Sequence, residues 1–170
     1  MPLIRNKQVV ANDPWIFARE GENLPADADV VVPLARFVAE SDELLARKGR
    51  VGVSIEPTDE IAQLSAHIDK LGLIALHFPK FGDGRCYSKA RLLRERFAYK
   101  GELRAVGEVL ADQLSYMLRC GMDSFYLVDG KDVKLAIACF DDFSVAYQAA
   151  TDQPLPLYRR VERGQAPKER

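Results

Sequence analysis

The chain has 170 residues, of which 48% are hydrophobic and 29% are charged, and its formal net charge is −1 at pH 7. This length suits one domain that buries a core without disulfides or metal ions. No apolar run approaches the roughly 20 residues that span a bilayer, and the near-neutral charge is unlike a general nucleic-acid-binding domain. Because the first residues lack a secretory signal pattern, we expect a soluble, cytoplasmic protein that contacts neither membrane nor nucleic acid.

The first 28 residues form a region of short apolar pieces separated by Asn6-Lys7 and Asn12-Asp13-Pro14, which predicts a small hairpin. From residue 29 onward, short β-branched or apolar runs alternate with segments of helical period. Five strands are expected, at residues 30–33, 50–55, 73–78, 102–106 and 124–128. This alternation is typical of an α/β fold with about five parallel strand–helix units. An open doubly wound sheet and half of a (β/α)8-like barrel both fit it.

The helical segments are defined by apolar stripes and by residues that start or stop helices. A stripe between Thr58 and Gly72 predicts a helix there, a second runs over residues 110–118, and a third over 133–140 follows Asp132. Residues 143–148 are a candidate for one more strand. We therefore expect one α/β domain over residues 1–150, with its core at 29–150, and a polar tail at 151–170 whose last residues are mobile.

Cysteines and histidines give no sign of a metal centre or a cofactor. Cys86, Cys120 and Cys139 are odd in number and far apart, and His67 and His77 do not have ligand spacing. No dinucleotide or phosphate-loop motif is present either. We expect reduced thiols, no bound metal and no cofactor with a recognisable binding motif.

Ligands of parallel α/β sheets gather at the carboxyl ends of the strands, so the loops there hold the candidate residues. Glu56 and Asp129 each follow a predicted strand and are the acid–base candidates. Cys86 is a further catalytic candidate, because a thiol at a helix N-terminus beside an arginine can have a lowered pKa. His77 lies at the end of its strand, where a hydrogen-bonded structural histidine is more common than a general base.

The loop FPKFGDGRCYS, residues 78–88, has features of an anion-binding site. Its glycines permit positive φ and a close ligand approach, while the following helix directs free N–H groups at the loop. The binding residues predicted there are Lys80, Gly82, Asp83, Gly84, Arg85 and Ser88. The alternative is a tight structural turn. Residues 80–104 carry a net charge of +5 against −6 for the remainder, which also favours an anionic ligand or an acidic partner.

Three segments carry a family resemblance: FPKFGDGRCYSKARLLRERF, the following YKGELRAVGEVLADQLSYMLRCGMDSF, and FDDFSVAYQ. They resemble the bacterial DUF934 family, a domain of unknown function whose members are often labelled probable oxidoreductases involved in sulfite reduction. The resemblance covers about residues 30–148 and implies a place in assimilatory sulfite reduction. In the family the position of Cys86 is commonly a small residue, which argues against a catalytic thiol.

We therefore expect an accessory protein that binds a small anion of the sulfite, sulfate or phosphate type, or that docks on sulfite reductase. One alternative is a small enzyme acting on a phosphorylated or sulfated metabolite. Another is an oxidoreductase with an unconventionally bound cofactor, since side chains alone do not carry out multi-electron reduction. If the sheet is an incomplete barrel, its exposed edge would favour a homodimer.

Overall fold

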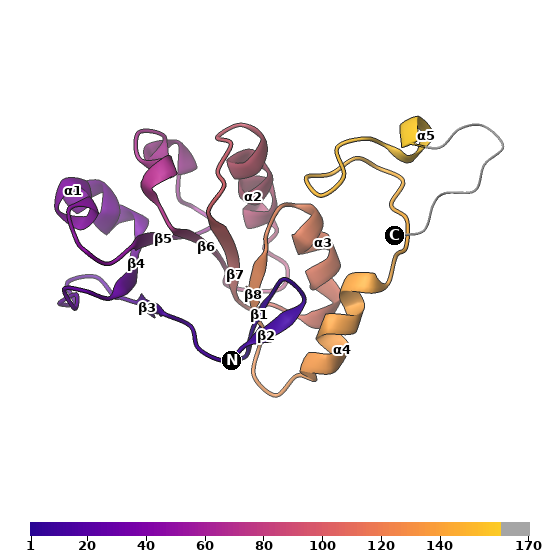
Figure 1. Cartoon of the computed structure of the whole chain (residues 1–170), viewed down its shortest axis with the longest axis horizontal. Helices are drawn as coiled ribbons and strands as arrows, with labels where there is room; N and C mark the ends of the chain where they lie inside the picture. The colour runs from indigo at the N-terminus through magenta and orange to yellow at the C-terminus, as the bar shows by residue number, and fades with distance from the viewer. Residues whose placement is uncertain (161–170) are drawn as a thin grey trace.

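The structure is a computed structural model, and it describes residues 1–160. Its centre is one eight-stranded sheet with the order β2-β1-β8-β7-β6-β5-β4-β3 (Figure 1). The strands are β1 (Leu3–Arg5), β2 (Gln8–Val10), β3 (Trp15–Phe17), β4 (Asp29–Pro33), β5 (Val51–Ile55), β6 (Leu73–Phe78), β7 (Glu102–Gly107) and β8 (Ser124–Tyr126). The five strands expected from residue 29 onward are confirmed.

The six strands from β3 to β8 are parallel and follow one another in chain order. The sheet curls into a half-barrel, and the rings of Phe17 in β3 and Tyr126 in β8 lie 6.1 Å apart although these strands are five positions apart. The fold is therefore α/β with a half-barrel sheet, one of the two expected architectures. The N-terminal hairpin of β1 and β2 is also confirmed, and β1 joins the sheet antiparallel to β8.

Helices cover one face of this sheet, as Figure 1 shows. The helices are α1 (Leu34–Leu45), α2 (Arg85–Glu95), α3 (Leu114–Arg119), α4 (Val133–Ala138) and α5 (Leu157–Arg160), with the 3-10 helices η1 (Ile61–Leu64), η2 (Ile68–Lys70), η3 (Ala111–Gln113) and η4 (Cys139–Asp141). Alternate strand residues such as Val53, Leu76 and Leu103 pack beneath them in the main core. Among the described residues, no helix is both long and apolar enough to cross a membrane.

Two secondary-structure predictions were wrong. The stripe between Thr58 and Gly72 forms η1 and η2 rather than one α-helix, because its backbone bonds join residues three apart, as from Ser65 N–H to the Ala62 carbonyl. Its apolar residues still face the core. Residues 143–148 contain no strand, because their backbone bonds join them to the C-terminal segment, as between Leu157 N–H and the Tyr147 carbonyl. The mobility predicted for the chain end falls on residues 161–170, outside the described residues.

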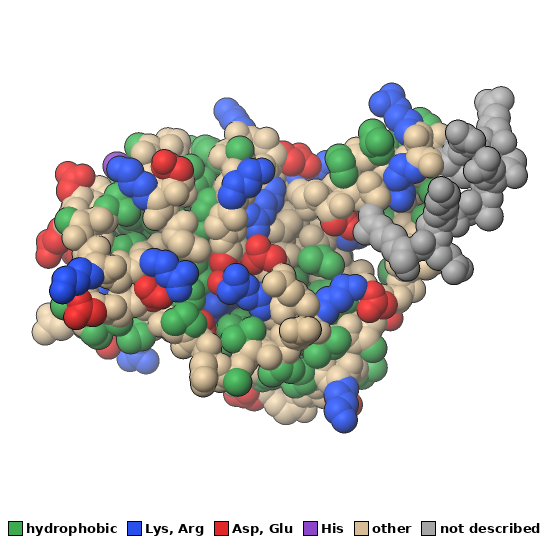
Figure 2. Space-filling model, in the orientation of Figure 1, with side chains coloured by type: hydrophobic (Ala, Val, Ile, Leu, Met, Phe, Trp, Pro, Cys, Tyr) green, Lys and Arg blue, Asp and Glu red, His purple; other side chains and the backbone are tan. Residues whose placement is uncertain are grey.

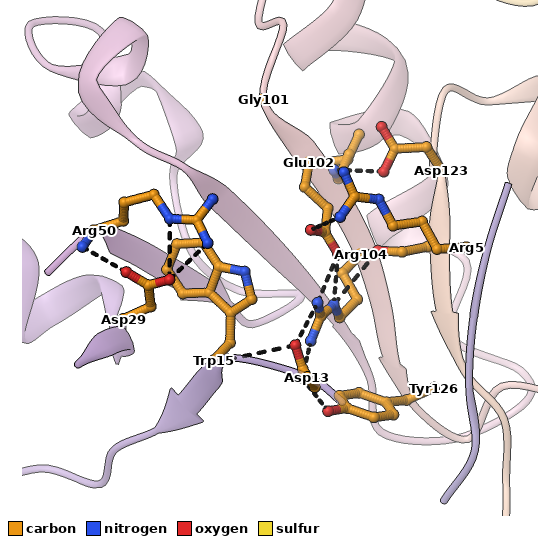
Figure 3. A network of polar contacts seen from close by, with 12 residues as sticks. Arg5, Asp13, Trp15, Asp29, Arg50, Gly101, Glu102, Arg104, Asp123 and Tyr126 are labelled. Atoms are coloured by element: carbon orange, nitrogen blue, oxygen red, sulfur yellow. Dashed lines mark hydrogen bonds and ion pairs between the residues drawn. The ribbon is translucent and has the colours of Figure 1, made fainter. Parts of the chain in front are cut away.

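The concave face of the half-barrel is crossed at its amino end by the segment between β2 and β3. Arg104, which is 1% exposed, donates to both carboxylate oxygens of Asp13 and to Glu102 (Figure 3). Tyr126 donates to Asp13, and Ser124 donates to Glu102 over 2.6 Å. We call these five residues the amino-end network. Every charge in it has a partner, so it ties the crossing segment to β7 and β8.

Candidate functional site

Glu56 and His77 lie side by side at the carboxyl end of the parallel strands. The parallel register of β5 and β6 pairs Ile55 with Leu76. Glu56 follows Ile55 and His77 follows Leu76, so these two residues also lie beside each other. The His77 Nδ1 atom is 2.7 Å from one carboxylate oxygen of Glu56 and 2.9 Å from the other. Both side chains are partly exposed, His77 at 35% and Glu56 at 52%. The sheet register thus produces an accessible carboxylate–imidazole pair.

This contact determines what the free imidazole nitrogen can do. A carboxylate at Nδ1 favours the tautomer with its proton there, which leaves Nε2 of the neutral ring as a proton acceptor. Nε2 lies beside Gly107, whose φ is +96°; a Cβ there would lie 3.0 Å from Nε2 and 2.4 Å from the Phe78 carbonyl oxygen. Glycine is therefore required at residue 107, both for its backbone angle and to leave space at Nε2.

Cys86, in the first turn of α2, lies next to the backbone of His77 but is not suited to nucleophilic chemistry. Its Sγ is fully buried and donates to the His77 carbonyl oxygen over 3.2 Å. Burial raises the pKa of this thiol to about 12; the charges of Lys89 and Arg85 oppose the shift, and the carboxylates of Asp83 and Glu56 add to it. The thiol therefore stays protonated and packs α2 against β6, which argues against the catalytic role considered for it.

The 79–88 loop is organised by an internal ion pair. Arg85 donates from Nε and Nη2 to the two carboxylate oxygens of Asp83, at 3.0 and 2.7 Å. This hydrogen bonding from Arg85 lowers the pKa of Asp83 to about 2. The Asp83 carboxylate also accepts from the Arg85 backbone N–H, and Glu108 accepts from the Phe81 N–H. An anion that used the Arg85 guanidinium would have to compete with Asp83.

The other predicted anion-binding residues lie along the loop after β6 and in the first turns of α2. Neither Gly82 nor Gly84 has positive φ, so neither uses the left-handed conformation that glycine permits. Ser88 lies one turn inside α2 and is exposed. Lys80 is exposed on the loop after β6 and forms no ion pair with another described residue. Anion binding at this loop stays a prediction.

Ion pairing also divides the basic segment 80–104. Four of its eight basic residues pair with carboxylates: Arg85 with Asp83, Arg91 with Glu95, Arg94 with Asp123, and Arg104 with Asp13 and Glu102. Figure 2 accordingly shows acidic and basic side chains interspersed on one face of the molecule. Half of the basic residues of this segment are therefore neutralised by partners within the chain.

Asp129 belongs to a separate contact. Its carboxylate, which is 75% exposed, pairs with the amino group of Met1 and not with Glu56 or His77. Within residues 1–160, no three His, Cys, Asp or Glu side chains are grouped so that they could hold a metal ion. Glu56 is therefore in contact with His77, whereas Asp129 is exposed and contacts only the amino group of Met1 among the ion pairs of residues 1–160.

Sequence reasoning did not identify His77 as a partner of Glu56. The signal that was available is positional, since each residue directly follows or ends a predicted strand and adjacent parallel strands end at one edge. Arg104 and Asp13 were also missed, because they are 91 residues apart and nothing local links them. Both sets of contacts depend on strand register, which composition and periodicity do not give.

The chain was compared with known proteins and protein families. The search of curated proteins finds no match. The family model described as bacterial protein of unknown function (DUF934) matches residues 52–158, which is more than half of the chain. This range includes Glu56, His77, Gly107 and the 79–88 loop, whereas β1 to β4 precede it. The chain is therefore a member of the DUF934 family.

Proposed function

We propose that the protein is an accessory protein of assimilatory sulfite reduction that binds an oxyanion of this pathway beside His77. The resemblance described above implies the pathway, and the Glu56–His77 contact is the observation that supports the binding site. His77 Nε2 has no hydrogen-bond partner among residues 1–160, and Gly107 leaves room beside it. Lys80, on the next loop, adds a positive charge.

The chemistry of the pair favours an oxyanion that carries its own proton. Bisulfite can transfer its O–H proton to Nε2, which forms an imidazolium and leaves the dianion sulfite hydrogen-bonded to it. The Glu56 carboxylate holds the ring through Nδ1, and the new contact at Nε2 is a charge-assisted hydrogen bond. Sulfate carries no such proton near neutral pH. The site should therefore bind sulfite more tightly than sulfate.

Calorimetry with the purified protein tests the binding site. Titrations with sodium sulfite and sodium sulfate should give tighter binding of sulfite to the wild type. His77→Gln should weaken sulfite binding about tenfold to a hundredfold, since it removes a charge-assisted hydrogen bond. Asp129→Asn is the matched control, because it changes an exposed side chain at the same edge. Equal affinities of wild type and His77→Gln for sulfite would refute the site.

Growth tests the pathway independently of the site. Deletion of the gene should slow growth on sulfate or sulfite as sulfur source and spare growth on sulfide or cysteine. A gene encoding His77→Gln should fail to restore growth, whereas the Asp129→Asn gene should restore it. Equal growth of the deletion strain on all four sources would remove the pathway assignment, whatever the binding result. Co-purification of sulfite reductase would add docking as the accessory role.

The same pair supports a second candidate, a small enzyme acting on a phosphorylated or sulfated metabolite. An imidazole oriented by a carboxylate is a common general base, and Nε2 is its free acceptor. This candidate predicts turnover of such a metabolite by the protein alone, lost in His77→Gln and retained in Asp129→Asn. Binding of sulfite without any turnover would favour the accessory role.

A further inference from the structure

The segment after η4, residues 142–160, forms an arm that is held against α3 by hydrogen bonds. Thr151 donates to the Arg119 carbonyl from its hydroxyl over 2.7 Å and from its backbone N–H over 3.2 Å. The Arg119 guanidinium donates back to the Gln148 carbonyl over 2.6 Å. In Figure 1 this orange-to-yellow segment loops back toward α3 before it reaches α5. The arm is thus a defined wall beside α3.

A cavity of about 910 Å³ lies between the arm, α3, η4 and the turn after β1. Its size is in the range of small-molecule sites, about 300–1,000 Å³. The residues that give it chemical character are Lys7, Arg119, Phe140, Phe143, Tyr147 and Arg160. No lining residue comes from β5, β6 or the loops after them, so the cavity is separate from the Glu56–His77 pair.

Two arginines of this cavity have unused hydrogen-bonding capacity. The Nε atoms of Arg119 and Arg160 are buried and have no hydrogen-bond partner among residues 1–160. The nearest carboxylate to Arg119 Nε is that of Asp152, at 3.7 Å, which is beyond a hydrogen bond. Among residues 1–160, two other buried side-chain nitrogens without a partner, Arg47 Nε and His67 Nδ1, lie outside the cavity, so the two arginines account for half of these atoms.

The other wall of the cavity is aromatic and accessible. Phe143 is 76% exposed and Tyr147 is 64% exposed, while Phe140 is buried against Phe125 with ring centroids 5.3 Å apart. Exposed aromatic side chains that line a cavity beside cations suit a ligand with an apolar body and an anionic group. Of the charged residues that line the cavity, three are cations and two, Asp141 and Asp152, are acids. Lys7 pairs with Asp141 and Arg119 lies near Asp152, whereas Arg160 has no carboxylate partner among residues 1–160 and donates from Nη2 to the Ala146 carbonyl.

We propose that this cavity is a second binding site, for a small molecule that joins a phosphate, sulfate or carboxylate group to an aromatic or other apolar body. The anionic group accepts from Arg119 and Arg160, and the body packs on Phe143 and Tyr147. The family match runs to residue 158, so it includes nearly all of the arm. The site does not depend on the chemistry proposed for His77.

Calorimetry with three probes separates the two parts of this ligand. Phenyl phosphate should bind the full-length wild type at one site, while inorganic phosphate and benzyl alcohol should each bind at least about tenfold more weakly. Arg119→Met should weaken phenyl phosphate binding about tenfold to a hundredfold, because it removes charged donors. Phe143→Ala should weaken it about tenfold through lost apolar contact, and it leaves the anchoring bonds of the arm in place.

Two control variants make the result specific. Arg96→Met removes one exposed positive charge outside the cavity and should leave phenyl phosphate binding unchanged. His77→Gln should also leave it unchanged, although it should weaken sulfite binding. The proposal is overturned if the wild type shows no saturable binding of millimolar phenyl phosphate, or if Phe143→Ala and Arg119→Met both bind it as tightly as the wild type. An equal loss in Arg96→Met would also overturn it.

Discussion

The two ends of the parallel strands use charged residues in opposite ways. At the amino end, Arg104 is buried and each of its three side-chain nitrogens donates to Asp13, Glu102 or Ser124. At the carboxyl end, Glu56 and His77 are partly exposed, and the imidazole Nε2 has no hydrogen-bond partner among residues 1–160. A polar group whose hydrogen-bond partners all lie within the protein stabilises the fold, whereas a polar group with an unused donor or acceptor can bind a ligand. Stability should therefore depend on the amino end and binding on the carboxyl end.

Arg104→Met should give the largest effect on stability, at the amino end. It removes the partner of two largely buried carboxylates, a change that typically costs about 3–5 kcal/mol. Urea unfolding followed by circular dichroism measures the loss. Arg50→Met is the matched control, since Arg50 is 60% exposed in its pair with Asp29 and its loss should cost less than about 1 kcal/mol. Equal midpoints for the two variants would contradict the structural role of the network.

Gly107→Ala should come next, because it strains the backbone at φ +96° and forces a methyl group against the Phe78 carbonyl. The expected cost is about 2–4 kcal/mol, with reduced sulfite binding as His77 is displaced. Gly130→Ala is the control, since its φ is +77° but no neighbouring atom of residues 1–160 lies within 4 Å of its Cβ position. That change should cost only about 1 kcal/mol and leave binding intact. A harmless Gly107→Ala would show that the space beside Nε2 is not needed.

Asp83→Asn should change the acid stability of the protein. The pKa of Asp83 is lowered to about 2 by hydrogen bonding from Arg85, so its ionised form is favoured in the folded state. The resulting stabilisation is complete above the ordinary aspartate pKa of about 3.9 and is lost as the pH falls through about 2. Unfolding free energies measured between pH 4.5 and 2 should therefore fall less steeply in Asp83→Asn than in the wild type. Parallel curves would contradict this.

His77→Gln should give the smallest effect on stability, within about 0.5 kcal/mol of the wild type, because its side chain is partly exposed and outside the core. The same variant should give the largest loss of sulfite binding. A strongly destabilised His77→Gln protein would mean that the Glu56–His77 pair stabilises the fold. That result would contradict the proposal that stability depends on the amino end of the sheet and binding on the carboxyl end.

Sequence patterns predicted the strands well because each strand of the core is a short apolar run bounded by polar residues. They failed for residues 58–72, where steps of three and four residues fit an α-helix and two successive 3-10 helices equally well. They placed Glu56 at the correct edge, since strand ends are visible in sequence. They could not pair it with His77 or join Asp13 to Arg104, because those contacts follow from register and from the curl of the sheet.

The most direct test of the proposed binding site is a nitrogen-15 NMR titration of the histidine side chains with sulfite. The chain has two histidines, and His67, which lies against Phe37, is an internal reference. We predict that added sulfite shifts the His77 Nε2 resonance toward its protonated position in a saturable manner and leaves His67 unchanged. The His77→Gln variant assigns the signals. If neither histidine responds, or if both respond alike, the proposal that His77 binds the anion is contradicted.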